Sequence, residues 1–527
     1  MKTEVAVKKK KKKKSNLLPK LIELDLGFEP SEQQVAIRKF IRGGKGNCFI
    51  KAVAGSGKTS TLKLISQYTP NALFLAFNNH VVNDLKAKLP PSMECRTNNS
   101  FGCKILGENP IASKRTQLSQ WKIHALSENA VTPYFTGMPK YKVRAIGNQL
   151  AQLVQMVMNT MTDFNDGDKI EAMVDDYGVD LGNNRTTLVP LVPGIVKKCL
   201  DIFYSAGEIS FTEQIWIPAY LGMKPRTFPD FILGDEQQDL NMAQITLMLN
   251  AMGPNTRYIG VGDPKQAMYA FTGARADAYD YLVESFHSNE FPLSVCYRCP
   301  HSHLELAREI VPYIEDRPDC PEGVIEDLPY DKLLKEGLSV EPGDLVLSRL
   351  SAPLVIQCIR LIKNRIPAKV RGGEIGRSLI KFCDDAIDYS GEKSDDINGL
   401  SSKVETYVES QKMRFSNRRD AENQFMILDD KREAILGMLS SFGSQTYTAF
   451  KRDIESIFAD EGAVTWLSTI HKAKGLEAKN VILFNSPQNK TKMPFVCKNQ
   501  SPTQAEQEKN IEYVALTRAK EKLTIIR

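Results

Sequence analysis

A glycine-rich loop between an apolar run and a helical stretch is the segment of the sequence best suited to chemistry. Cys48-Phe-Ile50 predicts a buried strand, and Ala52-Val-Ala-Gly-Ser-Gly-Lys-Thr59 follows it, with Ala52 where the general pattern has its first glycine. Such a loop turns backbone N–H groups toward phosphate oxygens, and its lysine and hydroxyl bind phosphate and Mg²⁺. We therefore predict a nucleotide site formed by Ala54, Gly55, Ser56, Gly57, Lys58, Thr59 and Ser60.

A second apolar run, Phe231-Ile-Leu-Gly, ends in two carboxylates, Asp235 and Glu236. In enzymes that hydrolyse nucleotides, one acid at a strand end holds Mg²⁺ and another polarises the attacking water. We expect Asp235 and Thr59 to be the metal ligands and Glu236 to be the general base. A surface acidic turn is the alternative, and it is disfavoured because the acids directly follow a buried strand.

These two segments, together with seven others in the same order, resemble the motifs of UvrD/Rep-like superfamily 1 DNA helicases over most of the chain. Ser31-Glu-Gln-Gln-Val-Ala-Ile37 resembles the Q motif, in which Gln33, or alternatively Gln34, would read adenine. A plain helix start is the other interpretation of this segment. Leu293-Ser-Val-Cys-Tyr-Arg-Cys299 resembles motif IV, where Tyr297 would stack on adenine and Arg298 would reach the γ-phosphate.

Three later segments complete the nucleotide site that the resemblance implies. Ile259-Gly-Val-Gly-Asp-Pro-Lys-Gln266 resembles motif III, whose glutamine would sense the γ-phosphate. Leu467 to Glu477 resembles motif V, with Gly475 near the γ-phosphate and Glu477 at the ribose, and Glu512 to Ala519 resembles motif VI, with Arg518 as a second arginine finger. The implied cofactors are ATP and Mg²⁺, and the implied catalytic residues are Lys58, Asp235, Glu236, Gln266, Arg298 and Arg518.

The resemblance also implies a track for single-stranded DNA made of aromatic and polar side chains. Tyr269 and Phe271 lie two residues apart, so on an extended segment they share a face and could stack on successive bases. The sequence departs from its relatives at Asn99, Phe271 and Thr272, where they commonly have histidine, tryptophan and arginine. The expected DNA contacts are Phe77, Asn78, Asn79, Thr97, Ser100, Tyr269, Phe271, Thr469, His471 and Lys474.

One cysteine spacing is also compatible with a different chemistry, the binding of zinc. Cys296 and Cys299 form a C-x-x-C pair with His301 and His303 nearby, which on spacing alone could begin a zinc site. No second cysteine pair follows in the sequence, and the resemblance gives the two intervening residues a role in binding nucleotide. We therefore favour the nucleotide interpretation of this segment over zinc. Ten scattered cysteines suit a reducing compartment better than a disulfide framework.

Composition and charge narrow the class of protein. The 527 residues are 42% hydrophobic and 25% charged, which is typical of globular domains, and the sequence shows neither a membrane-spanning run nor a secretory signal. The net charge of +6 is concentrated in residues 1–20, which contain nine lysines and one glutamate. We expect residues 1–25 to be a disordered tail that contacts phosphate, directs nuclear import or only aids solubility. The expected location is the cytoplasm, with a bacterial, viral or phage origin of the protein, or the nucleus if the tail is an import signal.

The elements that must position these residues form an α/β fold with two RecA-like P-loop NTPase domains in tandem, each a parallel sheet with a mainly helical insertion. We expect the first domain at 26–105 and 200–290 and its insertion at 106–199, where Ile146, Leu150, Leu153, Val154 and Val157 recur at helical spacing. The second domain is expected at 291–385 and 462–527, with a short helical insertion at 386–461. This compact second insertion is smaller than in large relatives.

The resemblance implies an ATP-dependent DNA helicase that moves 3′ to 5′ on single-stranded DNA in replication, repair or recombination. The alternative is a translocase that displaces proteins and needs a partner to unwind, because the second insertion is short. An inactive ATPase fold is disfavoured, since all six catalytic residues are present, while RNA as the track is left open. The expected partners are single-stranded DNA and junctions with duplex DNA, together with a loading partner or a nuclease. Because the sequence ends soon after motif VI, we expect any cleavage to come from another protein.

Overall fold

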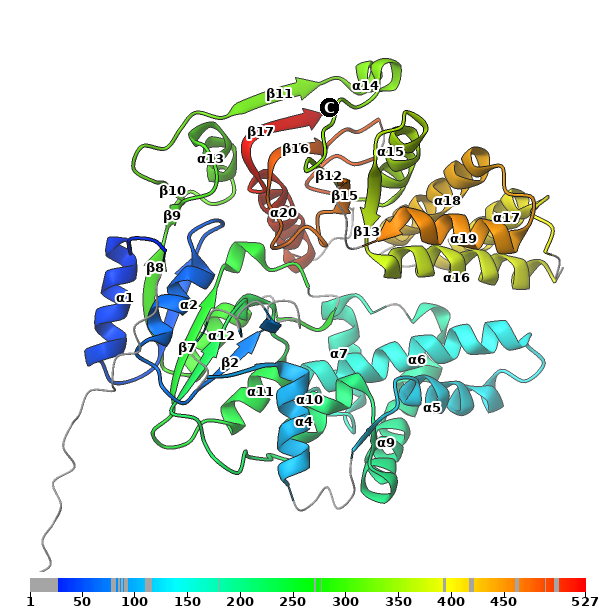
Figure 1. The fold of residues 1–527 in the computed structure, drawn as a ribbon. Helices are drawn as coiled ribbons and strands as arrows, with labels where there is room; N and C mark the ends of the chain where they lie inside the picture. The colour runs from blue at the N-terminus through cyan, green and yellow to red at the C-terminus, as the bar shows by residue number, and fades with distance from the viewer. Residues whose placement is uncertain are drawn as a thin grey trace, which may run out of the picture.

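The chain folds into two lobes, each built on a parallel β-sheet, in the computed structural model (Figure 1). The structure describes residues 27–76, 82–83, 86, 89, 93–109, 116–179, 181–269, 272–275, 277–391, 395–416, 421–459, 464–488, 490–496 and 502–527. The predicted lysine-rich tail and the predicted DNA contacts Phe77, Asn78, Asn79 and Phe271 lie outside the described residues. The predicted fold class, two parallel sheets with helical additions, is confirmed.

The first sheet has six strands in the order β3-β2-β6-β7-β1-β8. These are β1 (Cys48–Ala52), β2 (Ala72–Ala76), β3 (Glu94–Thr97), β6 (Phe231–Gly234), β7 (Arg257–Gly262) and β8 (Asn289–Leu293). All of their pairings are parallel. The carboxyl ends of β1, β6 and β7 therefore meet at one edge of the sheet, and this edge carries the glycine-rich loop and the acidic segment.

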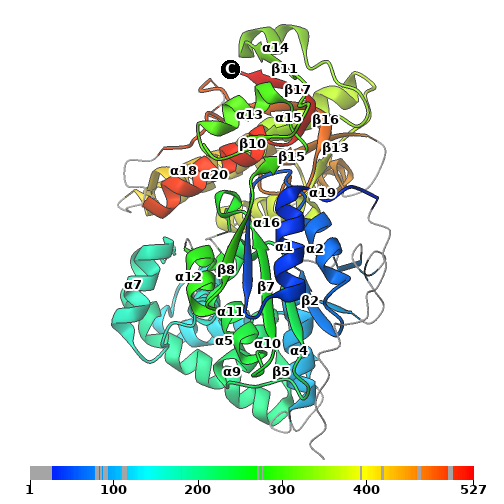
Figure 2. The same cartoon turned by 90° about the vertical axis from the view of Figure 1, so that its left-hand side faces the viewer.

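Alternating side chains send the two faces of this sheet into different cores. Ile50 packs with α1 (Glu32–Gly43) and α2 (Lys58–Ser66), whereas Phe49 packs with α11 (Met242–Asn250), α12 (Ala278–Ser285) and the helical insertion. Because successive residues of a strand point to opposite faces, both must be apolar in a strand covered on both sides. Figure 2 shows the sheet seen from the side, with α1 and α2 on one face and α12 on the other.

The insertion of the first lobe is helical. Its main helices are α5 (Lys122–Val131), α6 (Lys140–Thr160), α7 (Gly167–Tyr177) and α9 (Val192–Ala206), which follow α4 (Asn98–Glu108) and precede α10 (Phe211–Tyr220). The apolar stripe predicted within it lies on α6 and is buried, with Leu150, Leu153 and Val154 each 0% exposed. The boundaries expected at 105/106 and 199/200 fall inside α4 and α9, because both helices run continuously between the sheet and the insertion.

The second sheet has seven strands in the order β11-β17-β16-β12-β15-β13-β14, all paired in parallel. They are β11 (Val324–Leu328), β12 (Leu345–Ser348), β13 (Ala368–Arg371), β14 (Phe458–Ala459), β15 (Thr465–Thr469), β16 (Ala478–Phe484) and β17 (Ala519–Ile526). The segment before it contains β9 (Val295–Cys296), which pairs with β10 (Glu315–Asp316), and α13 (His301–Arg308). Helices α14 (Tyr330–Glu336) and α15 (Ala352–Lys363) also belong to this lobe.

A second helical layer extends from this lobe and includes α16 (Gly373–Ser390), α17 (Leu400–Phe415), α18 (Ala421–Phe442) and α19 (Tyr447–Ile457). The boundary expected at 385/386 falls inside α16. This layer touches the first insertion, where Arg414 Nη2 donates to Gln149 Oε1 at 3.2 Å. Helix α20 (Pro502–Leu516) contacts the short helix η5 (Pro264–Gln266), which follows β7. This contact joins the two lobes beside the sheet edges. Within the described ranges, no helix combines the length and apolar character that crossing a membrane requires.

Candidate functional site

The predicted phosphate-binding loop joins β1 to α2 in a backbone conformation that requires glycine. Gly55 has φ +68° and Gly57, which precedes α2, has φ +81°. A Cβ added to Gly55 would lie 2.7 Å from Arg298 Cβ, so the second half of the chain closes directly against the loop. The N-terminus of α2 therefore presents its N–H groups and Lys58 to the space between the lobes, as anion binding requires.

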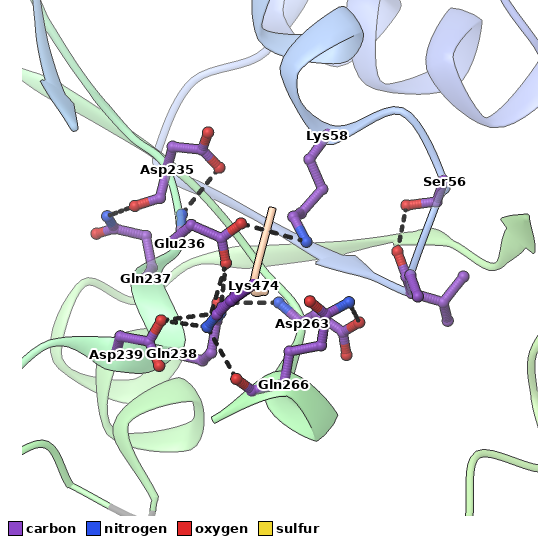
Figure 3. Close-up of polar contacts among 12 residues, drawn as sticks. Ser56, Lys58, Asp235, Glu236, Gln237, Gln238, Asp239, Asp263, Gln266 and Lys474 are labelled. Atoms are coloured by element: carbon purple, nitrogen blue, oxygen red, sulfur yellow. Dashed lines mark hydrogen bonds and ion pairs between the residues drawn. The ribbon is translucent and has the colours of Figure 1, made fainter. Parts of the chain in front are cut away.

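The acidic segment lies across from this loop at the end of β6 (Figure 3). Lys58 Nζ is 3.5 Å from Glu236 Oε1, and the Glu236 N–H donates to Asp235 Oδ1 at 2.8 Å. Glu236 has φ +51°, a left-handed conformation that costs energy in a residue with a side chain. That conformation aims its carboxylate at Lys58 and away from the sheet. The predicted triad of Lys58, Asp235 and Glu236 is thus brought together.

The two carboxylates have opposite electrostatic environments. Burial, followed by the charge of Glu236, raises the pKa of Asp235. Burial also acts to raise the pKa of Glu236, but the charges of Lys58 and Lys474 outweigh it, so this pKa is lowered. Glu236 is therefore ionised and able to accept a proton from water.

The donor set near Asp235 fits a magnesium ion. Thr59 is exposed at the start of α2 and lines the cavity between the lobes, while Asp235 is buried behind Glu236. A hydroxyl and a carboxylate oxygen are ligands that Mg²⁺ prefers. A divalent cation would also supply the positive charge that keeps the buried Asp235 ionised.

Lys474 enters this cluster from the second lobe. Its Nζ lies 3.6 Å from Glu236 Oε2, donates to the Gln266 carbonyl at 2.8 Å and makes a close ion pair with Asp239. The Lys474 side chain is 8% exposed. The resemblance implies a DNA contact for this lysine, and that contact stays a prediction; in the structure its ammonium group lies among the acids of the nucleotide site (Figure 3).

The segment after β7 provides the remaining side chains that the first lobe contributes to the site. Asp263 is fully buried and accepts from Gln266 Nε2 at 2.7 Å. Gln238 bridges the two acidic segments, because its Nε2 donates to Glu236 Oε2 at 2.6 Å and its Oε1 accepts from the Asp263 N–H at 3.0 Å. Gln266 also lines the cavity, where it can respond to a bound phosphate.

The second lobe contributes two arginines, a tyrosine and a glutamate. Arg298 Nε donates to Glu477 Oε2 at 2.7 Å, and Lys520 Nζ lies 2.5 Å from the other oxygen of that carboxylate. Arg518 is 1% exposed, donates to the Val514 carbonyl at 2.8 Å, and has a pKa lowered to about 10 by burial. The ring of Tyr297 is 41% exposed.

A cavity of about 820 Å³ lies between the lobes, within the range of small-molecule sites. Its walls include nearly all of the nucleotide-binding residues predicted from the sequence: Gly55, Ser56, Gly57, Lys58, Thr59, Ser60, Glu236, Gln266, Tyr297, Arg298, Gly475, Glu477 and Arg518. Ala54 and Asp235 lie just behind the wall. The fold therefore assembles residues from both lobes around one cavity.

The predicted adenine-reading glutamines have other partners in this structure. Gln33 Nε2 donates to Ser294 Oγ at 2.6 Å, and Gln33 Oε1 accepts from the Ser294 N–H at 3.0 Å. Gln34 caps α1 together with Ser31 and donates to Thr61 Oγ1 at 3.0 Å. Adenine recognition by either glutamine is therefore still a prediction, and it requires exchange of these hydrogen bonds.

Three residues that the sequence analysis did not single out belong to the site. Tyr513 accepts from the Ala54 N–H at 2.8 Å and so links α20 to the phosphate-binding loop. Arg317 and Lys520 line the cavity. Tyr513 and Lys520 lie within or directly beside the segment that resembles motif VI, which was the available signal, whereas no pattern marked Arg317.

The predicted DNA contacts within the described residues fall into two groups. Thr97 caps α4, accepting from the Ser100 N–H at 3.2 Å, and both line a polar cavity of about 460 Å³ that also includes Lys86 and Arg96. Tyr269 instead lies at the contact between the lobes, where its hydroxyl donates to the His471 carbonyl at 3.2 Å. Thr469 is 9% exposed at the end of β15.

The zinc alternative for the C-x-x-C segment has no supporting geometry. His301 Nδ1 lies 3.1 Å from Asp316 Oδ2, and His303 Nε2 lies 3.3 Å from the Val324 carbonyl. Among the residues that the structure describes, no three His, Cys, Asp or Glu side chains are grouped as a metal site requires.

Comparison with known proteins gives related sequences over most of the chain. The model of the UvrD-like helicase C-terminal domain matches residues 129–527. The F-box DNA helicase protein 1 of Schizosaccharomyces pombe is 24% identical over 517 residues, which cover 90% of this chain and 55% of that protein. A probable DNA helicase II homolog of Mycoplasma pneumoniae is 35% identical over 101 residues, or 18% of this chain and 14% of that protein. The chain thus spans about half the length of the first of these relatives.

Proposed function

Because the chain belongs to the family of UvrD-like helicases, we propose that it is an ATP-driven motor that moves 3′ to 5′ on single-stranded DNA and unwinds duplex DNA. The observation that carries this proposal is the cluster of Lys58, Glu236 and Lys474, in which cations from both lobes converge on one carboxylate beside the cavity. Such a cluster can form only when the lobes are close together. A chemical event at the cavity is thereby linked to the distance between the lobes.

Each group around the cavity has a role that its position supports. The N–H groups of the loop and Lys58 bind phosphate, and Thr59 and Asp235 would hold Mg²⁺, which would supply charge neutralisation at the phosphates. Glu236 orients a water molecule and accepts its proton. The arginines Arg298 and Arg518 stabilise negative charge that develops on the transferred phosphoryl group, provided that Arg518 exchanges its carbonyl partners for phosphate.

Movement along DNA would follow from contacts that cross between the lobes. Tyr513 touches the loop, Lys474 touches Glu236, and Arg298 packs on Gly55. Loss of the γ-phosphate weakens the attraction that holds these groups together, so the lobes separate after each hydrolysis. DNA held by both lobes, through residues such as Thr97, Ser100, Thr469 and His471, would then advance by alternating grip.

A second candidate function is a motor that displaces proteins from single-stranded DNA and needs a partner to unwind. The observation that favours it is the second insertion, whose helices α16 to α19 contact the first insertion through Arg414 and Gln149. An insertion held in this way has less freedom to engage a duplex. Both candidates act wherever DNA is copied or repaired, in the cytoplasm or in a nucleus, and both accommodate a loading or nuclease partner.

The test is ATP hydrolysis with and without single-stranded DNA or RNA, alongside strand displacement on duplexes with 3′ or 5′ tails. Glu236→Gln is the blank, because it keeps the shape of the side chain and removes the base. DNA-stimulated hydrolysis with displacement from 3′ tails supports the helicase. Stimulation without displacement supports the partnered translocase. Hydrolysis no higher than the Glu236→Gln blank in a folded preparation rules out the motor.

A further inference from the structure

The two cysteines that flank Tyr297 and Arg298 are buried against the nucleotide site. Cys296 and Cys299 are each 0% exposed, and the Cys299 N–H donates to Cys296 Sγ at 3.4 Å. A Cβ added to Gly55 would lie 2.9 Å from Cys296 Sγ. Cys299 Sγ lies 3.5 Å from the Thr517 carbonyl oxygen. The pair therefore touches the phosphate-binding loop on one side and the residue before Arg518 on the other.

The local fold brings the two sulfurs together. Cys296 ends β9, the chain then turns through two residues, and α13 begins shortly after Cys299. A strand, a C-x-x-C turn and a helix form an arrangement in which the first thiol is stabilised as a thiolate by the second. The hydrogen bond from Cys299 is the main cause that lowers the pKa of Cys296.

This pair differs from cysteines elsewhere in the described chain. Burial raises the pKa of Cys48, Cys199, Cys358 and Cys383 to about 12, so those thiols stay protonated at neutral pH. Cys320, which is partly exposed beside the pair, donates to the Cys299 carbonyl at 3.5 Å. Because the thiolate is the form that reacts with oxidants, the lowered pKa of Cys296 and its contact with a second cysteine distinguish this pair from those thiols.

We propose that Cys296 and Cys299 are a redox modification site whose oxidation to a disulfide by hydrogen peroxide switches off the ATP site. The Cys296 thiolate attacks one peroxide oxygen, which breaks the O–O bond and gives a sulfenic acid and hydroxide. The Cys299 sulfur then attacks the sulfenic sulfur, forms the S–S bond and expels the oxygen as a second hydroxide, with its own proton taken by the first. The proton that Cys296 released on ionising converts the second hydroxide to water. In total two thiols and one peroxide give one disulfide and two waters. A dithiol reductant reverses the reaction by exchange.

Disulfide formation would affect ATP binding and hydrolysis because Tyr297 and Arg298 lie between the two cysteines. This step rests on the proposed function of the cavity. A disulfide bond is about 2.05 Å long, shorter than any hydrogen-bonded contact between sulfurs, so the turn must tighten when it forms. That turn holds Tyr297 and Arg298, and its tightening withdraws Cys299 from Thr517. A displacement of about 1 Å in such positioning groups costs up to roughly 100-fold in rate.

The experiment treats the whole protein with graded hydrogen peroxide and reads two quantities. Mass spectrometry of digested protein measures the disulfide within the peptide that contains Cys296 and Cys299. ATP hydrolysis with single-stranded DNA, together with binding of a fluorescent ATP analogue, measures the state of the site. Cys296→Ser and Cys299→Ser remove the reaction, and Cys320→Ser is the matched control because it leaves the pair intact.

We expect the disulfide to form in the folded protein, hydrolysis to fall by about tenfold or more, and dithiothreitol to restore it. We expect Cys320→Ser to respond like the natural sequence, and the two variants of the pair to resist peroxide. Thiols that stay reduced in the folded protein, a disulfide that leaves hydrolysis and ATP binding unchanged, or protection by Cys320→Ser would each overturn the switch. A reduced protein that neither binds nor hydrolyses ATP overturns the proposed function itself. The disulfide measurement does not depend on ATP, so it distinguishes this failure from a failure of the switch.

Discussion

The ammonium group of Lys474 lies 3.6 Å from the carboxylate of Glu236, on the side opposite Lys58, whose Nζ is 3.5 Å from the same carboxylate. One lysine comes from each lobe, so Glu236 is held between two cations only in the closed arrangement. Both lysines act to lower its pKa, against the effect of burial. Separation of the lobes would remove one of them, which would make Lys474 a link between lobe closure and the proposed general base.

Replacing Lys474 by alanine should lower DNA-stimulated ATP turnover by roughly 100-fold, the size of a general-base contribution. The physical reason is that Asp239 and Glu236 lose the cation that they share, so the carboxylate of Glu236 is no longer held in position beside the cavity. The measurement is kcat for ATP alongside the affinity for single-stranded DNA. Lys472→Ala is the control, because the Lys472 side chain is 50% exposed and pairs with Glu374. A loss of DNA affinity with unchanged kcat would mean that Lys474 contacts DNA and does not support ATP hydrolysis.

Local geometry explains why the sequence predicts one part of this site and not another. Gly55 and Glu236 follow buried strands on either side of β7, and the carboxyl ends of the strands in a parallel sheet lie at one edge, so their association needs only the strand pattern. Lys474 and Asp239 are 235 residues apart, and their ion pair depends on how two lobes dock. The insertion boundaries predicted from the sequence fall inside α4, α9 and α16 for a related reason, since these helices run continuously between sheet and insertion and no loop marks the change.

Replacing Gly55 by alanine should lower the affinity for ATP by roughly tenfold. A residue with a side chain at this position would keep φ +68°, and its Cβ would lie 2.7 Å from Arg298 Cβ and 2.9 Å from Cys296 Sγ. Such strain costs about 1–3 kcal/mol. About 1.4 kcal/mol corresponds to a tenfold change in affinity. The measurement is titration with a fluorescent ATP analogue. Gly107→Ala is the control, because Gly107 lies in α4 with no atom within 4 Å of the added Cβ. Equal affinities for the two variants would contradict the close approach of the lobes at the loop.

Replacing Tyr513 by phenylalanine should destabilise the contact between the lobes. The hydroxyl accepts from the buried Ala54 N–H at 2.8 Å, and a buried donor left without an acceptor costs about 1–3 kcal/mol. We expect the first thermal unfolding midpoint to fall by about 3 °C per kcal/mol, and the KM for ATP to rise. Tyr220→Phe is the control, because that ring is 44% exposed. An unchanged midpoint and KM would show that the loop finds another acceptor.

The pH dependence of stability should carry a contribution from His471. Burial, followed by the charges of Arg349 and Lys472, lowers the pKa of His471 to about 3, whereas an unfolded histidine titrates near about 6.5. Between these values the unfolded chain binds a proton that the folded chain does not, so folding stability falls as pH falls. The contribution is fully present above about pH 6.5 and is lost progressively toward pH 3, by about 1 kcal/mol at pH 5 once partial exposure is allowed for. Denaturant unfolding from pH 7.5 to 5 should show a shallower decline for His471→Gln than for the natural sequence, and parallel curves would mean that this imidazole is as easily protonated in the folded chain as in the unfolded one.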